Sequence, residues 1–291
     1  MKMLSAISLF SGAGGLDIGF EQEGFHPLFA NEADHYAAMT WRRNRPKTAD
    51  VMVEGDIREH IFRLNNYKDV DVLFGGPPCQ GFSVGGKMDP KDERSELVNT
   101  FMEAVEILNP KTFVMENVRA LGALEKWKKV RDGITACGNN LGYDVSYQIH
   151  HTSDYGVPEK RDRVIFLGVR KDIGRTKIFY QNLAKHTKTP LTSRKVLLKA
   201  GKYGSDVNPK TCGAKITLAK NPILRRSPYQ GMLVNGGGRP IDLDKIAPTL
   251  TASMGGNYTP IVDEAALYDT SIPNWFKSYQ ERLRSGTVTC F

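Results

Sequence analysis

One cysteine of the chain stands in a setting that suits nucleophilic chemistry. Cys79 lies in GGPPCQGFS, residues 75–83, directly after the apolar run Asp71–Phe74, which predicts a buried strand that the glycines end. Pro77 and Pro78 fix their own φ angles and disfavour a helix before them, so the turn that carries the thiol should be stiff. A thiolate at the carboxyl end of a strand is a strong nucleophile once its pKa falls below the free value of about 8.5. A structural cysteine in a Gly/Pro turn is the plainer alternative, and the motifs around it favour the nucleophile.

A glycine-rich segment near the start of the chain could hold a nucleoside. The sequence FSGAGGLD, residues 10–17, follows a strand-like run and should open a helix. Gly12, Gly14 and Gly15 let the backbone approach a ligand closely, and a helix N-terminus offers free N–H groups. A dinucleotide fingerprint would need glycine at the position of Asp17, whose carboxylate would repel a pyrophosphate. The segment therefore favours a nucleoside without phosphates.

Two further acids end the next two predicted strands. Glu32 ends the second strand, where it could accept hydrogen bonds from ribose hydroxyls. Asp56 ends the third, where it could accept a hydrogen bond from an adenine amino group. Each acid alone would be an ordinary strand-end or cap residue. With Asp17, three acids follow three successive strands in order, which predicts a nucleoside pocket.

The elements that must position these residues alternate along the first 170 residues. Glu96–Leu108 has apolar side chains at helical spacing and ends before Asn109-Pro110. The strand-like runs are Leu4–Phe10, His26–Glu32, Asp71–Phe74, Thr112–Glu116 and Val164–Val169. This alternation predicts an α/β fold with a doubly wound, mostly parallel sheet that helices cover on both faces.

The later part of the chain differs in composition and charge. The segment Lys171–Gly238 is rich in Lys, Gly, Pro and Ser without a sustained period, which predicts a smaller irregular domain that ends in a glycine hinge at 236–238. Between residues 160 and 230 the chain has 18 Lys and Arg against three Asp and no Glu, a net charge of +15 within an overall +8. This asymmetry favours a polyanion partner, most simply nucleic acid, over an ordinary lysine-rich surface.

The cysteines and the hydropathy limit the environment of the protein. The cysteines lie tens of residues apart without CxxC or His-pair spacing, which predicts no metal site and no disulfide scaffold and favours a reducing cytoplasm; they are Cys79, Cys137, Cys212 and Cys290. No stretch approaches the roughly 18 apolar residues of a membrane span. Residues 1–10 predict a strand and not a signal peptide.

The motifs together resemble a known family. In chain order, FSGAGGLD, NE, GDI, GGPPCQGFS, ENV and YGVPEKRDR resemble those of the DNA cytosine-5 methyltransferases, and Arg239–Asn257 resembles the next motif. The resemblance covers residues 4–170 and 239–262, and seven ordered motifs are specific together. It implies a Rossmann-like methyltransferase that uses S-adenosylmethionine. We expect a catalytic and cofactor-binding domain over 1–170, a target-recognition domain over 171–253 and a C-terminal return segment over 254–291.

The resemblance also implies roles for individual residues. Catalysis would use Cys79, Glu116, Arg161 and Arg163; Arg163 would contact the cytosine O2, and Arg161 would support the loops of Cys79 and Glu116. The cofactor contacts would come from Phe10, Gly12, Gly14, Gly15, Leu16, Glu32, Asp56, Ile57, Pro78 and Leu97. The DNA contacts would come from Gln80, Ser83, Arg225 and Arg226, with Gly81 to Asp92 as a loop that closes on DNA.

The residue types fit this chemistry. C5 of cytosine is a poor nucleophile until a group adds to C6, and the thiolate of Cys79 could supply that addition. Glu116 could hydrogen-bond or protonate ring N3 and hold the exocyclic amine. The activated C5 would take the methyl group of S-adenosylmethionine, and loss of the C5 proton would release the enzyme. A base inside a duplex cannot reach such a site, so it must be flipped out.

The chain departs from the family pattern at two places. Glu159 stands where the family usually has Gln, and its carboxylate could weaken contacts in the pocket or pair with Lys160. After Asp263 the chain lacks the family's GN-x-V segment, which packs against the first motif. We therefore hypothesise a truncated chain or one half of a split enzyme that a second polypeptide completes.

Three functions follow from these observations. The leading one is a monomeric DNA cytosine-5 methyltransferase, which acts at a specific site in double-stranded DNA and could accompany a restriction endonuclease. The second is a transfer-RNA cytosine-5 methyltransferase, which the long basic insert argues against. The third is a catalytically impaired DNA-binding remnant, which the missing C-terminal segment supports and the intact Cys79, Glu116 and Arg163 argue against.

Overall fold

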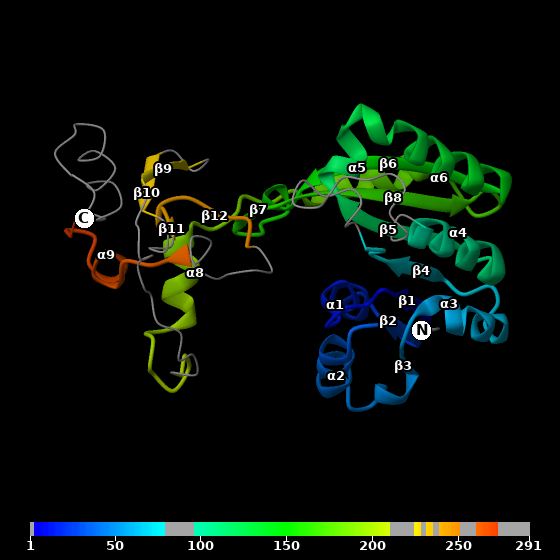
Figure 1. The fold of residues 1–291 in the computed structure, drawn as a ribbon, viewed down its shortest axis with the longest axis horizontal. Helices are drawn as coiled ribbons and strands as arrows, with labels where there is room; N and C mark the ends of the chain where they lie inside the picture. The colour runs from blue at the N-terminus through cyan, green and yellow to red at the C-terminus, as the bar shows by residue number, and fades with distance from the viewer. Residues whose placement is uncertain are drawn as a thin grey trace. The chain divides into compact units, whose positions relative to one another are not determined.

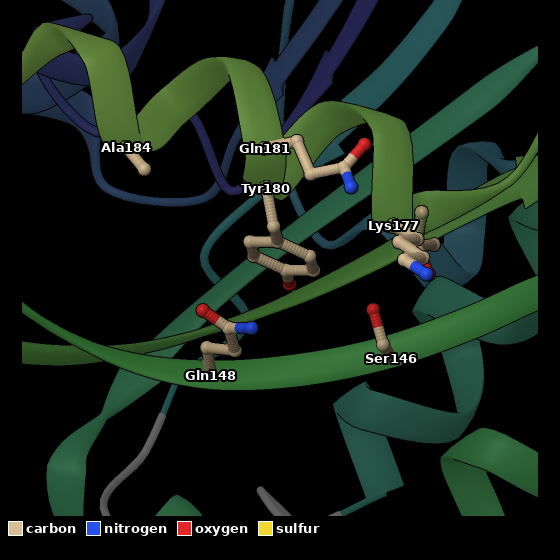
Figure 2. Close-up of a pocket in the computed structure, with 7 residues that line it drawn as sticks. Ser146, Gln148, Lys177, Tyr180, Gln181 and Ala184 are labelled. Atoms are coloured by element: carbon tan, nitrogen blue, oxygen red, sulfur yellow. The ribbon is translucent and has the colours of Figure 1, made fainter.

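The computed structural model describes residues 3–78, 96–209, 224–227, 231–234, 239–250 and 260–272. The chain divides into two compact units (Figure 1). Unit 1 comprises residues 1–150 and 162–186, and unit 2 comprises residues 151–161 and 187–291. Residues 171–186, expected in the recognition domain, lie within unit 1. The functional division at 170 and 253 stays a prediction.

Unit 1 is built on a seven-stranded sheet with the strand order β3-β2-β1-β4-β5-β8-β6. The neighbours from β3 to β5 pair in parallel, and β8 is antiparallel to β5. The strand order reverses between β1 and β4, and ligands of open α/β sheets bind beyond the carboxyl ends of the strands at such a point. The strands are β1 (Leu4–Leu9), β2 (Phe25–Glu32), β3 (Met52–Glu54), β4 (Val72–Gly75), β5 (Thr112–Val118), β6 (Tyr143–His151) and β8 (Asp162–Arg170).

Helices lie on both faces of this sheet (Figure 1). The alternation of β1 assigns the faces: Ile7 and Leu9 enter the larger core with α4 and α6, whereas Ala6 packs in a second cluster with Val72 and Phe74. A third cluster places Trp41 of α2 against β2 and β3. The helices are α1 (Gly15–Gln22), α2 (His35–Asn44), α3 (Ile57–His60), α4 (Glu96–Leu108), α5 (Arg119–Ala123), α6 (Lys128–Asn140) and α7 (Thr176–Leu183).

The predicted strands and the predicted helix of unit 1 are confirmed, with ends that shift by at most two residues. Helix α4 buries Phe101 fully, a contact of about 1.5–3 kcal/mol, and Asn109 ends it with a left-handed φ of 45° before Pro110. Strand β6 was not predicted, because it lies at the edge of the sheet and is largely polar.

Two short helices form within the segment that was predicted to be irregular. The N-terminus of α7 is capped from outside the helix, since Asp144 of β6 accepts hydrogen bonds from the backbone and the hydroxyl of Thr176 at 2.8 and 3.0 Å. Helix α8 (Ser193–Ala200) has a local cap, in which Thr192 accepts from the backbone of Lys195. A cap from a distant strand leaves no local sequence signal.

Unit 2 contains three pairs of short strands among its described residues. They are β7 (Glu159–Lys160) with β12 (Ala247–Pro248), β9 (Leu224–Ser227) with β10 (Gly231–Val234), and β11 (Arg239–Pro240) with β13 (Pro260–Ile261). A small core of Leu243, Ala266 and Leu267 joins α8 to α9 (Glu264–Tyr268). Arg194 of α8 donates to the carbonyls of Ala266 and Leu267, which fixes the end of α9.

The described ranges contain neither a candidate membrane-spanning helix nor a candidate metal site. No helix there has the length and apolarity to cross a bilayer. No group of three His, Cys, Asp or Glu side chains gathers there as a metal site would require.

Candidate active site

The glycine-rich segment after β1 forms a tight turn at the carboxyl edge of the sheet. Phe10 ends the strand with a left-handed φ of 54°, a conformation that costs a non-glycine residue about 1–3 kcal/mol and persists only where its surroundings enforce it. The N–H of Ser11 donates to the carbonyl of Asn31 at 3.0 Å, and that of Gly12 donates to Glu32 Oε2 at 2.7 Å. The end of β2 therefore holds the turn.

Glu32 connects two turns through its two carboxylate oxygens. Oε2 accepts from Gly12, and Oε1 accepts from the N–H of Asp34 at 2.8 Å, at the start of α2. Each carboxylate oxygen has a second acceptor site. Glu32 can therefore accept a hydroxyl of a ligand while it still holds both turns.

A buried asparagine fixes the turn that leads to Asp56. Asn31, 1% exposed, donates from Nδ2 to the carbonyls of Val53 and Gly55, both at 3.0 Å. Asp56 then caps α3 and forms an ion pair with Arg58 at 2.6 Å. The hydrogen bond from Arg58 holds the pKa of Asp56 below its usual value, so this acid remains an ionised acceptor at neutral pH.

Two glycines bring the end of β4 into close contact with its neighbours. A Cβ on Gly75 would lie 2.2 Å from the carbonyl oxygen of Leu9, so the approach of β4 to β1 requires glycine there. A Cβ on Gly76 would lie 3.2 Å from Glu116 Oε2. The backbone that leads toward Cys79 thus passes beside the carboxylate of Glu116.

A second buried asparagine holds the diproline turn. Asn117, 1% exposed, donates from Nδ2 to the carbonyl of Pro77 at 3.2 Å, while its Oδ1 accepts from the N–H of Val118 at 2.9 Å. Pro78 is the last described residue before Cys79. The turn is therefore tied to the end of β5, where Glu116 lies.

Glu116 and Arg163 form an ion pair across the β5–β8 ladder. Arg163 Nε lies 2.6 Å from Glu116 Oε1, and the same guanidinium donates from Nη1 to the carbonyl of Asp162 at 2.8 Å. The two side chains are 28% and 21% exposed, for Glu116 and Arg163 respectively, so a ligand can reach the pair. The pairing of Val118 with Arg163 in the antiparallel ladder sets this geometry.

The predicted site residues divide into four groups, of which the last consists of three arginines of unit 2. Unit 1 brings together at the carboxyl edge Phe10, Gly12, Gly14, Gly15, Glu32, Asp56, Pro78, Glu116 and Arg163, whereas Ile57 is 2% exposed and packs in the large core. Leu16 is 37% exposed in the first turn of α1, and Leu97 packs against the large core from α4. Cys79, Gln80, Ser83 and the loop 81–92 lie outside the described residues, as does the hinge 236–238.

Two further predictions concern arginines of unit 2. Arg161 belongs to this unit, where its carbonyl accepts from the N–H of Thr152 at 2.9 Å. Arg225 and Arg226 lie in β9, of which the backbone is described. The roles expected for these three arginines stay predictions.

Asp17 has a different position from the one its motif suggested. It is 1% exposed and accepts a hydrogen bond from Trp41 Nε1 at 2.9 Å. Burial raises its pKa, and the hydrogen bonds and Arg45 only partly oppose that. The carboxylate lies inside unit 1, so Asp17 does not line the nucleoside pocket as its motif suggested, and its effect on a pyrophosphate stays a prediction.

Glu159 joins the two segments of unit 2 that carry the last two motifs. Its backbone pairs with Ala247 in the β7–β12 ladder, and its Oε1 accepts from the N–H of Leu250 at 3.0 Å. The hydroxyl of Thr249 also donates to the carbonyl of Lys160. Neither sequence-based alternative anticipated this bond, which a Gln side-chain oxygen could accept equally well.

Comparison with known proteins identifies the family. The family model of C-5 cytosine-specific DNA methylases matches residues 4–227. The chain belongs to this family. It is 34% identical over 249 residues to the type II methyltransferase M.NgoFVII of Neisseria gonorrhoeae, which covers 85% of this chain and 64% of that protein. It is 28% identical over 313 residues to M.FnuDI of Fusobacterium nucleatum, and this alignment covers 98% of this chain and 88% of that protein.

The shared lengths vary among these relatives. M1.HphI of Haemophilus parahaemolyticus is 40% identical over 178 residues, which are 59% of this chain and 47% of that protein. The chain thus spans about half to two thirds of the length of the first curated relatives that it matches.

Solved structures agree on the fold. A crystal structure described as a candidate DNA modification methyltransferase encoded within an E. coli prophage aligns with a TM-score of 0.61 and 24% identity, covering 85% of this chain and 82% of that one. The S. pombe Dnmt2 methyltransferase aligns with a TM-score of 0.54 and 15% identity, and the alignment covers 90% of this chain and 74% of that one. At this identity the likeness shows the methyltransferase fold, which confirms the predicted α/β class.

Proposed function

We propose that the chain transfers a methyl group from S-adenosylmethionine to C5 of a cytosine that is flipped out of double-stranded DNA. The observation that carries the proposal is the ion pair of Glu116 and Arg163 at 2.6 Å, beside the asparagine-held turn that leads to Cys79. Membership of the C-5 cytosine-specific family supports the same reaction.

The carboxyl edge of unit 1 fits an adenosyl cofactor. A Cβ on Gly12 or Gly15 would meet nothing within 4 Å, so the backbone of the turn lines open space. Glu32 offers acceptors for the ribose hydroxyls, and the ionised Asp56 offers one for the adenine amino group. S-adenosylmethionine supplies an electrophilic methyl group when bound.

The residues of the chain would then act on the cytosine ring in sequence. The Cys79 thiolate adds to C6, while Glu116 protonates or hydrogen-bonds N3 and Arg163 contacts O2. The electron pair released to C5 would form the bond to the methyl group that S-adenosylmethionine supplies, with S-adenosylhomocysteine as the leaving group. A base then takes the C5 proton, and the electrons of that bond expel the Cys79 thiolate from C6.

DNA recognition would lie mainly in the basic part of the chain. The excess of Lys and Arg between residues 160 and 230 can neutralise phosphates. Arg225 and Arg226 would contact bases or phosphates, and Gln80 and Ser83 would contact the DNA near the flipped base. The chain would act as a monomer in the cytoplasm, where its DNA is, and the type II names of its relatives make a restriction endonuclease the natural partner.

The first test is transfer of labelled methyl groups from S-adenosylmethionine to unmethylated DNA of mixed sequence, with bulk transfer RNA in a parallel reaction. The product nucleosides are then separated and identified. We expect 5-methyldeoxycytidine from the DNA and no label on the RNA. Label on RNA alone would favour the transfer-RNA enzyme, and label on neither would overturn the proposal for this chain.

A further inference from the structure

Beneath the cofactor turn lies an arginine that is almost fully buried. Arg45 directly follows α2, and its side chain is 6% exposed. Its Nε pairs with Glu21 of α1 at 2.7 Å, and its Nη2 donates to the carbonyl of Gly14 at 3.0 Å. Its guanidinium carbon lies 4.7 Å from the centre of the Trp41 ring. One side chain thus joins α2, α1 and the turn.

Gly14 rests directly on this guanidinium. It has a left-handed φ of 88°, and a Cβ there would lie 2.2 Å from Arg45 Nη1 and 2.8 Å from Trp41 Cδ1. Contacts this short leave no space for any side chain at position 14. The path of the turn on its inner side is therefore set by Arg45 and Trp41.

A buried carboxylate completes the cluster. Asp17 is 1% exposed, and its Oδ1 accepts from Trp41 Nε1, which orients the indole beneath the guanidinium. Asp17 Oδ2 and Arg45 Nη1 are buried and have no hydrogen-bond partner within the described part of the chain. Burying a guanidinium and a carboxylate with incomplete hydrogen bonding costs free energy. Unsatisfied buried groups of this kind call for an explanation beyond stability.

The turn is consequently held from two sides. Glu32 of β2 binds the N–H of Gly12 on the side that faces the ligand space, and Arg45 binds the carbonyl of Gly14 on the opposite side. The open Cβ directions of Gly12 and Gly15 contrast with the filled one of Gly14. One side of the turn is left for a ligand, and the other is fixed to α2.

We propose that Arg45 is a positioning residue for the cofactor: through Gly14 it holds residues 12–15 in the conformation that binds S-adenosylmethionine. Asp17 and Trp41 hold the guanidinium in place, and Arg45 itself does not touch the cofactor. The proposal rests on the function proposed above for the turn. It assigns affinity for the cofactor partly to residues that contact no ligand.

The test compares Arg45→Met and Arg45→Lys with Arg43→Met, which removes the charge of an exposed arginine in the last turn of α2. Calorimetry measures the Kd for S-adenosylhomocysteine, the stable product. We expect Arg45→Met to weaken binding by about 10-fold or more, the loss that a charged hydrogen bond brings, with Arg45→Lys in between and Arg43→Met unchanged. In methyl transfer, the KM for the cofactor should rise while kcat at saturation stays within about twofold.

Amide hydrogen exchange gives a second readout that needs no cofactor. In Arg45→Met, the amides of residues 11–16 should exchange faster, while those of β5 keep their protection. If Arg45→Met does not fold, Arg45→Lys and Glu21→Ala test the proposal by the same calorimetry and hydrogen-exchange measurements.

Two results would overturn the proposal. One is a folded Arg45 variant that binds S-adenosylhomocysteine as tightly as the wild type. The other is unchanged exchange of residues 11–16. If the wild-type chain does not bind S-adenosylhomocysteine at all, the proposed function fails instead, and the exchange experiment still shows whether Arg45 holds the turn.

Discussion

At the scale of single residues, two asparagines and one ion pair determine the shape of the candidate site. Asn31 and Asn117 each lie one residue before the end of a strand, and each donates from its side-chain amide to backbone carbonyls at the end of a neighbouring strand. The carboxylate of Glu116 is then held by Arg163 at 2.6 Å beside the backbone of Gly76. Reactive groups of this kind need support that fixes their orientation.

The first prediction at this scale concerns Glu116. Glu116→Gln removes both the proton donor and the ion pair with Arg163, so kcat for methyl transfer should fall by about 10²- to 10⁴-fold. The Kd for S-adenosylhomocysteine should stay within about threefold, because Glu32 and Asp56 are untouched. Glu103→Gln, an exposed acid on α4, is the matched control. Methyl transfer by Glu116→Gln at the wild-type rate would exclude the proposed role.

The second prediction concerns Glu159. Glu159→Gln should leave methyl transfer and thermal stability unchanged, because the amide oxygen can still accept from Leu250. Glu159→Ala should free the segment 247–250 and destabilise unit 2 by about 1 kcal/mol, the usual cost of one hydrogen bond. Thermal unfolding and limited proteolysis of both variants measure this. A large loss of activity in Glu159→Gln would show that the negative charge itself matters.

The residue types of the site were predictable from the sequence, but their partners were not. Glu116 and the glycines stood out because each lies at or directly after the end of a strand-like run in a chemically suggestive motif, and the role of Cys79 stays a prediction. Asp17 stood in the same kind of motif, yet its side chain turns inward to Trp41, which lies 24 residues away. Only tertiary packing decides between these orientations.

At the scale of elements, close packing of glycines joins the helices to the sheet. Helix α6 contains two glycines with opposite surroundings. A Cβ on Gly138 would lie 2.6 Å from Val145 Cγ2, at the contact of the helix with β6, whereas a Cβ on Gly133 would meet nothing within 4 Å. Within this one helix, the effect of side-chain packing can therefore be compared with the effect of helix propensity.

We predict opposite effects for alanine at these two positions. Gly133→Ala should stabilise unit 1 by about 0.5–1 kcal/mol, because alanine has the higher helix propensity. Gly138→Ala should destabilise it by about 1–3 kcal/mol through overpacking against β6. Thermal unfolding followed by circular dichroism compares the two variants with the wild type. Equal shifts in the same direction would contradict the helix–sheet packing described here.

At the scale of the whole molecule, the sequence predicted the sheet of unit 1 better than the rest of the chain. Buried parallel strands such as β4, with Val72, Leu73 and Phe74, are apolar runs that stand out, and glycines or acids mark their ends. The edge strand β6 is polar, α7 takes its cap from Asp144 of that strand, and the strands of unit 2 are two to four residues long. None of these features produces a local periodic signal.

The buried Asp17 and the partly buried Asp71 should make the stability of unit 1 depend on pH in opposite directions. Burial would raise the pKa of Asp71, but hydrogen bonds from Lys111 and Ser5 outweigh it and hold that pKa below its usual value. The stability from Asp71 is therefore present above the unfolded pKa and lost as the pH falls. Burial dominates at Asp17 and raises its pKa, so its contribution is present at low pH and lost as the pH rises.

The corresponding amide variants test these signs. Relative to the wild type, Asp71→Asn should be least stable at about pH 7, and the difference should shrink toward about pH 3.5. Asp17→Asn keeps the oxygen that Trp41 contacts, so its stability relative to the wild type should increase from about pH 3.5 to about pH 7. Thermal unfolding across this range measures both. Parallel pH profiles for the two variants would contradict the assignment.

The most direct measurement of the central claim is covalent capture by DNA in which 5-fluorocytosine replaces cytosine. Fluorine cannot leave C5 as a proton does, so a chain that has added Cys79 to C6 and transferred its methyl group should stay bound to the DNA. We predict that the wild-type chain with S-adenosylmethionine forms a complex that survives denaturing electrophoresis, and that Cys79→Ala forms none. A complex with Cys79→Ala, or methyl transfer to ordinary DNA by that variant, would contradict the account.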